Sequence, residues 1–216
     1  MRLYLRISGE ILVTLGVLVL GFLAYMYWGT AMREAGAQQA LTRELGRQWS
    51  AGPSLTALTS PGDLALGKPF ALIRIPSLGA SWQFAVVQGT GLPELALGPG
   101  HVPGTGLPGR VGNFVVAGHR VTAGSPFWSL PSLRPGSVVY VETIAGIYEY
   151  QLTTTPALVS ADDDAMLAPV PFHPGAVARR PMITLITCGP PWTGTSRVVV
   201  TGVLIHTLPR EQGIEG

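Results

Sequence analysis

Three residues of the chain have the chemistry of a covalent catalyst and stand at the ends of apolar runs. Cys188 ends the run MITLITC, His119 follows the run GNFVVAG, and Arg197 begins the run RVVVTG. A thiolate is a strong nucleophile, and a histidine beside it can hold or donate a proton. Arginine presents fixed N–H donors to an oxygen that gains negative charge. These residue types are the ones that nucleophilic catalysis by a thiol requires.

Each of these residues also has an ordinary structural interpretation. The chain contains one cysteine, so it forms no internal disulfide, and a single thiol is often an inert buried group. A histidine considered by itself is more often structural than catalytic, and an arginine at the start of a strand is often a solvated charge. All three nevertheless stand at strand edges, and Cys188 and Arg197 flank one loop. This combination favours a catalytic site over three unrelated structural roles.

The sequence offers weak candidates for metal binding. Four side chains could in principle bind zinc: His101, His119, His173 and Cys188. No pair of them has the C-x₂₋₄-C or H-x₃₋₅-H spacing of structural zinc sites. The acidic run 162–164 lacks the spaced ligands of a calcium loop, and it is better explained as the cap of a short helix around 162–167 or as a solvent-facing segment. We therefore expect no metal and no cofactor.

Short apolar runs between turn residues would supply the strands that position the three reactive side chains. The runs cover 70–75, 81–87, 112–118, 137–143, 148–155, 182–188 and 196–207. In one of them Tyr148, Tyr150 and Leu152 alternate with polar residues, as in a half-buried strand. Long helical patterns are absent from the same part of the chain. Short strands in this number and at this spacing predict an all-β barrel or sandwich.

The N-terminal region contains a segment that is apolar and long enough to cross a membrane. Over 7–28 only Glu10 is charged, and a helix of this length spans roughly 33 Å, which exceeds the hydrocarbon core of a bilayer. Arg2 and Arg6 precede the segment, which favours a cytoplasmic N-terminus. The alternative is a cleaved signal peptide with its cleavage site at 35–37, but the apolar run exceeds the usual core of about 7–15 residues. We expect an uncleaved anchor, and either interpretation places the rest of the chain outside the cytoplasm.

Composition agrees with a membrane-anchored protein and argues against one class of partner. Hydrophobic residues make up 47% of the chain, charged residues make up 12%, and the mean hydropathy is +0.36. The 14 basic and 12 acidic residues leave a net charge of only +2. A protein that binds nucleic acid through electrostatics would need a basic stripe, so we expect no nucleic-acid partner.

These features divide the chain into an anchor, a connecting region and one folded domain. The connecting region begins with a weakly amphipathic helical stretch over 29–50, which we interpret as a stalk, and continues over 51–69 as a linker rich in proline and glycine. The predicted boundaries are 1–6 for the cytoplasmic N-terminus, 7–28 for the transmembrane anchor, 29–69 for the stalk and linker, 70–208 for the folded domain and 209–216 for the C-terminal tail.

Two segments resemble the sortases, the membrane-anchored cysteine transpeptidases of Gram-positive bacteria. The first is GNFVVAGHR at 112–120, and the second is TLITCGPPWTGTSRVVVTG at 184–202. The second contains the sortase signature Thr-Leu-x-Thr-Cys, followed after a short loop by Arg197. The segment GPGHVPGT at 98–105 is similar to class E sortases in particular. The resemblance covers roughly residues 70–205.

This resemblance implies a fold and a set of site residues. The fold would be a closed sortase-like β-barrel of about seven or eight strands with a short helix, preceded by the transmembrane helix. Cys188 would be the nucleophile, and His119 would be the general acid that protonates the leaving amine. Arg197 would bind the substrate backbone and stabilise the oxyanion. Thr187, inside the signature, and His101 are expected to line the substrate site.

The resemblance also implies a reaction and its partners. The enzyme would cleave a Leu-Pro/Ala-x-Thr-Gly sorting motif of secreted surface proteins between Thr and Gly, and join the threonine carboxyl to an amine of the cell-wall peptidoglycan precursor. It would be a single-pass protein of the cell membrane with an extracytoplasmic catalytic domain. Val102 stands where class E relatives often have an aromatic residue, and the loop 189–196 has its own composition. Both departures bear on the choice of motif.

Two other functions are compatible with the same residues. A membrane-tethered β-domain could bind envelope partners without catalysis, although a binding module has no need for cysteine, histidine and arginine at strand edges. A hydrolytic cysteine peptidase could use the same three residues, but it would release a free acid where a transpeptidase forms an amine-dependent product.

Overall fold

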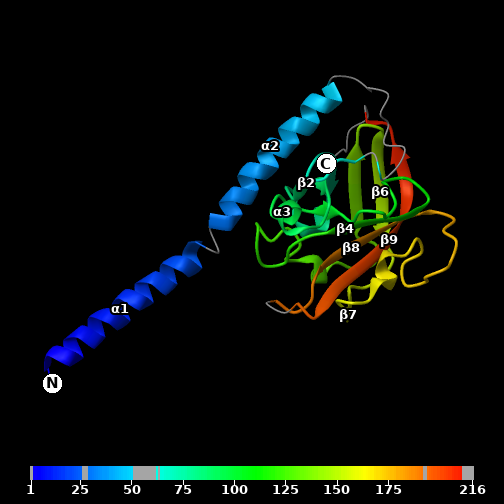
Figure 1. Ribbon diagram of the computed structural model, residues 1–216. Helices are drawn as coiled ribbons and strands as arrows, with labels where there is room; N and C mark the ends of the chain where they lie inside the picture. Colours follow the sequence, from blue (N-terminus) through cyan, green and yellow to red (C-terminus); the bar gives the residue numbers. More distant parts are fainter. Residues whose placement is uncertain (1, 26–28, 51–61, 63, 192–193, 211–216) are drawn as a thin grey trace.

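Two helices precede a β-barrel in the computed structural model, which describes residues 2–25, 29–50, 62, 64–191 and 194–210 (Figure 1). Helix α1, Arg2–Ala24, projects away from the barrel. Helix α2, Thr30–Ser50, lies against it. The remaining elements belong to the barrel and its connecting loops.

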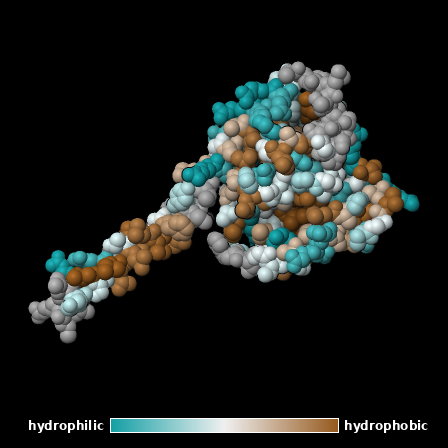
Figure 2. Space-filling view, in the orientation of Figure 1, coloured by the Kyte–Doolittle hydropathy of each residue, from teal (hydrophilic) through white to brown (hydrophobic). Residues whose placement is uncertain are grey.

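Helix α1 has an apolar surface that the barrel leaves uncovered. The window Arg6–Leu23 has a mean hydropathy of 1.8, and none of it is buried. Figure 2 shows this apolar surface along the helix. The charged side chain of Glu10 pairs with Arg6 one helical turn away, at 3.1 Å. Length and composition therefore make α1 a candidate membrane span, as the sequence predicts, while residues 26–28 of the predicted anchor lie outside the described residues.

Nine strands form one sheet that closes into a barrel. Their order is β6-β5-β1-β2-β3-β4-β8-β9-β7. The first eight strands in this order form a closed barrel, because β6 also pairs with β9. Strand β7 lies outside the closed barrel and pairs with the first part of β9. The strands are β1 (Pro69–Arg74), β2 (Gln83–Gln88), β3 (Gly100–His101), β4 (Gly112–Ala117), β5 (Val138–Thr143), β6 (Gly146–Leu152), β7 (Ala157–Ser160), β8 (Pro181–Cys188) and β9 (Ser196–Leu208). The short helical elements are η3 (Pro76–Leu78), α3 (Leu92–Leu95), η4 (Leu130–Ser132) and η5 (Asp164–Leu167). The predicted all-β barrel is thus confirmed.

Strand β4 is apolar on both faces because both of its faces are covered. Phe114 and Val116 point into the barrel core, together with Tyr150 of β6. Val115 belongs to a second apolar cluster on the outside, with Met166 of η5. A strand buried on both sides appears in the sequence as an unbroken apolar run, which is the pattern of FVVA at 114–117. The short helix η5 therefore covers the outer face of the strand that leads to His119.

All seven strands predicted from the sequence are present, with boundaries shifted by a few residues. The short helix predicted around 162–167 is also present, as the 3₁₀ helix η5. The sequence did not predict β3, which has only two residues, or β7, whose side chains are mostly exposed. Strand β3 contains no apolar run, and the apolar run of β7, at 157–159, is only three residues long.

Helix α2 packs against the barrel, which differs from the stalk expected over 29–50. Leu45 lies against Ala85 and Val87 of β2. The Gln38 side chain accepts a hydrogen bond from the Ala85 N–H (2.7 Å) and donates to the Leu97 carbonyl (2.7 Å). The buried side chains of α2 recur at helical spacing: Glu34, Gln38, Leu41, Leu45 and Trp49. Two of these five are polar, and that is why the sequence pattern looks only weakly amphipathic.

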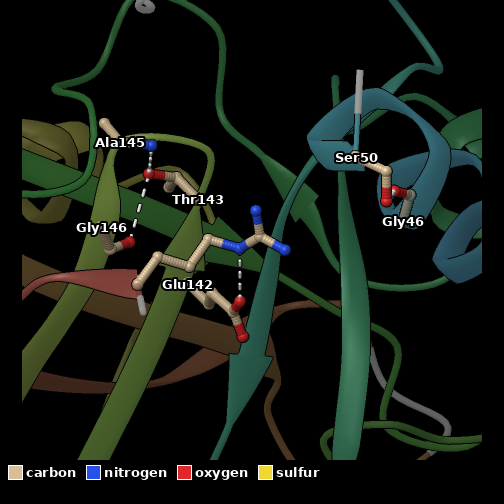
Figure 3. Close-up of polar contacts among 7 residues, drawn as sticks. Gly46, Ser50, Glu142, Thr143, Ala145 and Gly146 are labelled. Atoms are coloured by element: carbon tan, nitrogen blue, oxygen red, sulfur yellow. Dashed lines mark hydrogen bonds and ion pairs between the residues drawn. The ribbon is translucent and has the colours of Figure 1, made fainter. Parts of the chain in front are cut away.

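The chain after β9 returns to helix α2. The Arg210 guanidinium pairs with Glu142 of β5 at 3.0 Å, and its carbon lies 4.3 Å from the ring centroid of Trp49 on α2. Figure 3 shows Glu142 beside the β5–β6 turn, where the Thr143 hydroxyl donates to the Gly146 carbonyl at 3.4 Å. Helix α2, β5 and the segment after β9 are thereby joined on one side of the barrel.

We expect Leu45→Ala to destabilise the protein, because Leu45 is fully buried between α2 and β2. The lost burial and the cavity left behind should lower the free energy of unfolding by about 2–5 kcal/mol. Denaturant unfolding of the full chain in detergent measures this change. The matched control is Leu92→Ala, since Leu92 is 82% exposed and should change stability by less than about 0.5 kcal/mol. Equal stability of the two variants would show that α2 is not docked in solution.

Candidate active site

Parallel pairing of β4 and β8 brings His119 and Cys188 to the same edge of the barrel. The two strands are in register from Gly112 opposite Pro181 to Ala117 opposite Ile186. The pairing continues past β4, because the Gly118 N–H donates to the Ile186 carbonyl at 3.0 Å. Both strands run in the same direction, so the residues at their C-terminal ends and just beyond them lie side by side. Chain positions 119 and 188 are neighbours for this reason.

The antiparallel pair β8–β9 places Arg197 at the same edge. Cys188 and Arg197 are direct partners in the register of the two strands. Arg197 Nη1 donates to the carbonyls of Gly194 (3.1 Å), in the loop between the strands, and Ser196 (3.0 Å), the first residue of β9. These two contacts engage one of the three guanidinium nitrogens. The structure therefore brings the three residues predicted to be catalytic together at one edge, from three adjacent strands.

His119 is half-buried on the loop after β4. Its carbonyl accepts a hydrogen bond from the Phe127 N–H at 3.1 Å. The Phe127 ring packs over Gly118, where a Cβ atom would lie 2.7 Å from the ring, so glycine is required beside the histidine. Burial lowers the pKa of His119 from its usual value of 6.5. At neutral pH the imidazole is therefore mainly uncharged and able to accept a proton.

Thr187 has its side chain buried between strands. Its hydroxyl donates to the Gly118 carbonyl at 2.8 Å, and the side chain is only 2% exposed. This contact joins β8 to the chain next to His119. Thr187, which the sequence analysis expects to line the substrate site, thus has a buried side chain that holds two segments of the chain together.

His101 lies inside the barrel, away from the surface. Its ring is fully buried and stacks on Phe114 with the ring centroids 5.3 Å apart. Nδ1 lies 2.6 Å from the Gln88 side-chain oxygen, and Nε2 lies 2.9 Å from the Thr105 hydroxyl and 3.0 Å from the Gly106 carbonyl. His101, which the sequence analysis expects to line the substrate site, has no exposed surface in this structure. The residue instead holds β3 and the following loop against the core.

Protonation of His101 is expected to make the fold sensitive to acid. Burial lowers the pKa of His101 from 6.5 to about 4. The unfolded chain therefore binds the proton at a higher pH than the folded chain, so stability is lost as pH falls from 6.5 toward 4. This group alone should remove about 3 kcal/mol from the free energy of unfolding over that range.

The measurement compares the pH dependence of stability in the wild type and in His101→Gln. The comparison is needed because burial also raises the pKa of Glu34 to about 7, and that group makes stability fall as pH rises through the same range. Both proteins contain Glu34, so the difference between them isolates His101. Equal slopes for the two proteins between pH 4 and 6.5 would contradict the prediction.

The described residues contain no group of three or more His, Cys, Asp or Glu side chains arranged to hold a metal ion. Of the four candidate zinc ligands, only His119 and Cys188 lie near each other, since His101 lies in the core and His173 is exposed on the loop before β8. The Asp163 carboxylate accepts a hydrogen bond from the Ala165 N–H at 3.0 Å at the start of η5. The acidic run thus has the helix-cap role considered for it.

An apolar cluster, largely buried, packs on the outside of β4, β8 and β9 and begins two residues before His119. Its buried members are Val115, Met166, Ile186 and Val199, and its half-buried members are Val102, Ala117, Val159 and Leu167. At the far end of β4, Leu167 also lines a cleft of about 570 Å³, together with Arg110 and Asn113. The cluster therefore extends from the chain beside His119 to a cleft at the opposite end of β4.

The site includes one residue that sequence reasoning missed. Arg120 Nη1 donates to the Gly189 carbonyl at 2.6 Å, across 69 positions of the chain. The only signal in the sequence is that each partner directly follows a predicted catalytic residue, His119 or Cys188.

A closed barrel with a thiol, an imidazole and a guanidinium at one edge is the arrangement expected of a thiol-dependent acyltransferase. Comparison with known proteins identifies one family. A family model described as "Sortase domain" matches residues 73–205. Sortase SrtE1 of Streptomyces coelicolor is 33% identical over 215 residues, which cover 96% of this chain and 59% of that protein. Sortase SrtE2 of the same organism is 29% identical over 211 residues, covering 93% and 82%.

Solved structures agree with these sequence matches. Sortase E from Streptomyces avermitilis matches with a TM-score of 0.64 and 38% identity, over 70% of this chain and 97% of that one. The chain belongs to the sortase family. Its relatives among the sortases E support the class E assignment predicted from the segment 98–105. The chain spans 59% of the length of SrtE1.

Proposed function

We propose that the protein is a membrane-anchored cysteine transpeptidase that cleaves a Leu-Pro/Ala-x-Thr-Gly sorting motif between Thr and Gly and transfers the threonine carboxyl to a cell-wall amine. The observation that carries the proposal is the position of His119, Cys188 and Arg197 at the ends of three adjacent strands, at one barrel edge. Membership of the sortase family supports the reaction class. A similar structure, that of sortase E1 from Streptomyces coelicolor, holds a tripeptide in its active site.

The first half of the reaction forms a thioester. Uncharged His119 accepts the proton of the Cys188 thiol, and the thiolate attacks the threonine carbonyl carbon. Arg197 donates to the carbonyl oxygen as it becomes negative. The C–N bond to glycine then breaks, its electron pair goes to nitrogen, and His119 returns the proton to that nitrogen. The products are a Cys188 thioester and a peptide with a new amino terminus.

The second half transfers the acyl group. The nitrogen of the acceptor amine attacks the thioester carbon, and the C–S bond breaks to give the Cys188 thiolate. His119 accepts the proton lost by the attacking nitrogen. The partners in this proposal are secreted proteins with a C-terminal sorting motif and the amine of a peptidoglycan precursor.

Helix α1 would hold the enzyme beside both partners. Its apolar window is of membrane-spanning length, and Arg2 and Arg6 precede that window or stand at its start. Positive charge is retained on the cytoplasmic side of single spans, so the catalytic domain would face outward. The localisation that we propose is the cell membrane, with one span and an extracytoplasmic barrel.

Mass analysis of products tests the proposed reaction. The full chain in detergent is incubated with a Leu-Ala-x-Thr-Gly or Leu-Pro-x-Thr-Gly peptide, with and without triglycine. The expected product is the peptide cut after threonine and joined to triglycine. Free acid alone in both conditions would identify a hydrolytic peptidase. Failure to cut either peptide, together with a Cys188 thiol that resists alkylation, would favour a binding module.

Arg197→Ala is expected to lower kcat/KM for the peptide by on the order of 10²–10³, because the oxyanion loses its donor. Arg197→Lys should recover only part of this loss, since an ammonium lacks the fixed fork of donors. Steady-state cleavage of the peptide measures both variants. An alanine variant within about threefold of the wild type would exclude the oxyanion role, since loss of a donor costs far more.

A further inference from the structure

The residue that follows His119 contacts the residue that follows Cys188. Arg120 Nη1 donates to the Gly189 carbonyl at 2.6 Å, a short distance typical of hydrogen bonds from charged donors. The two loops that meet here are far apart in the sequence and follow β4 and β8. The backbone pairing of β4 with β8 ends with Gly118. The contact between Arg120 and Gly189 therefore holds the two loops together beyond the paired strands.

The contact belongs to a chain of hydrogen bonds that includes the neighbours of all three reactive residues. The Gly189 N–H donates to the Ser196 carbonyl at 2.7 Å, and Arg197 Nη1 donates to the same carbonyl at 3.0 Å. Gly189 fits tightly, because a Cβ atom there would lie 2.0 Å from the Ser196 hydroxyl. We call Arg120, Gly189 and Ser196 the loop brace. Each of its members is adjacent in the chain to His119, Cys188 or Arg197.

Arg120 does not have the usual role of a surface arginine. None of the ion pairs among the described residues involves it. Its Nε is buried and has no hydrogen-bond partner in the described part of the chain. An unpartnered buried donor costs stability. The side chain is therefore poorly explained as a stabilising group, whereas its Nη1 contact joins the two halves of the site.

We infer that Arg120 is a positioning residue, which fixes the separation of His119 and Cys188 by holding the Gly189 carbonyl. This inference rests on the proposed transpeptidase function. Proton transfer between imidazole and thiol requires hydrogen-bond distance, and a displacement of about 1 Å can lower the rate on the order of 10²-fold. Arg120 acts through the backbone of the two loops and leaves peptide binding unaffected.

The kinetic test compares Arg120→Ala, Arg120→Lys and the control Arg134→Ala in the full chain in detergent. Arg134 also donates to backbone carbonyls, but to those of Ser132 and Leu133, at the end of η4 and directly after it. We expect Arg120→Ala to lower kcat for peptide cleavage by about 10- to 100-fold with KM changed less than about twofold. Arg120→Lys, which keeps a charged donor, should recover at least half of the lost activity on a logarithmic scale. Arg134→Ala should match the wild type.

A second readout needs no peptide and so separates this inference from the proposed function. Hydrogen exchange is measured in the wild type and in Arg120→Ala over 118–128 and 188–191, with β1 and β2 as reference strands. Faster exchange in these two loops alone, with a melting temperature lowered by less than about 4 °C, supports the loop brace. Unchanged exchange in the loops overturns it. A general increase that includes β1 and β2, or a raised KM with kcat unchanged, would also overturn it, by showing a structural or substrate-binding role. If the wild type itself forms no thioester, the proposed function fails while the exchange result still decides the role of Arg120.

Discussion

Replacing Cys188 with alanine is expected to lower turnover of the sorting-motif peptide by on the order of 10⁴- to 10⁶-fold. The thiolate is the group that forms the covalent intermediate, and no other cysteine can replace it because the chain contains only one. Intact-mass analysis of the full chain with peptide and no acceptor should show a gain equal to the acyl fragment. The same analysis of Cys188→Ala should show no gain.

The single cysteine makes this experiment unusually direct, since any thioester must be at residue 188. Thr187→Ala is the matched control: it removes a neighbouring side chain of β8 that is buried against Gly118 and carries no nucleophilic role. The control should keep the mass gain, with a lower rate because one contact between β8 and the histidine loop is lost. Normal turnover by Cys188→Ala would rule out thioester chemistry for this protein.

The barrel could be predicted because most of its strands are apolar runs between turn residues. A strand such as β4, covered on both faces, is visible from sequence whether or not its partners are known. Strand β7 is held by its pairing with Val198 and Val199 of β9, although its own side chains are mostly exposed. Its formation depends on a partner some forty positions away, and local sequence contains no signal for that pairing. The same is true of the two-residue strand β3.

The three reactive residues could be predicted because each stands at the end of an apolar run, a property that the sequence displays. Their meeting depends on the parallel register of β4 with β8, which sequence alone does not determine. His101 and Thr187 show the limit of prediction from local sequence. Both stand inside motifs, yet the side chain of each is buried and hydrogen-bonded to groups elsewhere in the fold. Arg120 was missed because its contact requires two loops whose meeting follows from the same register.

His119→Ala is expected to lower kcat/KM for the amide peptide by about 10²–10⁴, because the leaving nitrogen loses its proton donor. Burial lowers the pKa of His119 below 6.5, so the protonated form decreases as pH rises above that pKa. A p-nitrophenyl ester of the same acyl group has a leaving group that departs without a proton. The ester is measured at a pH at which the Cys188 thiol is already ionised. Under this condition His119→Ala should lower kcat/KM by less than about tenfold.

The comparison of the two substrates assigns the role of His119 more closely than loss of activity alone. If His119 only positioned the loop, its removal would slow the amide and the ester equally, because both need the same approach of sulfur to the carbonyl. If it donates a proton to the leaving nitrogen, only the amide depends on it strongly. His173→Ala is the matched control, since His173 is exposed on the loop before β8, and both substrates should react at wild-type rates. Equal defects for amide and ester in His119→Ala would therefore leave His119 a positioning role and require another donor for the leaving amine.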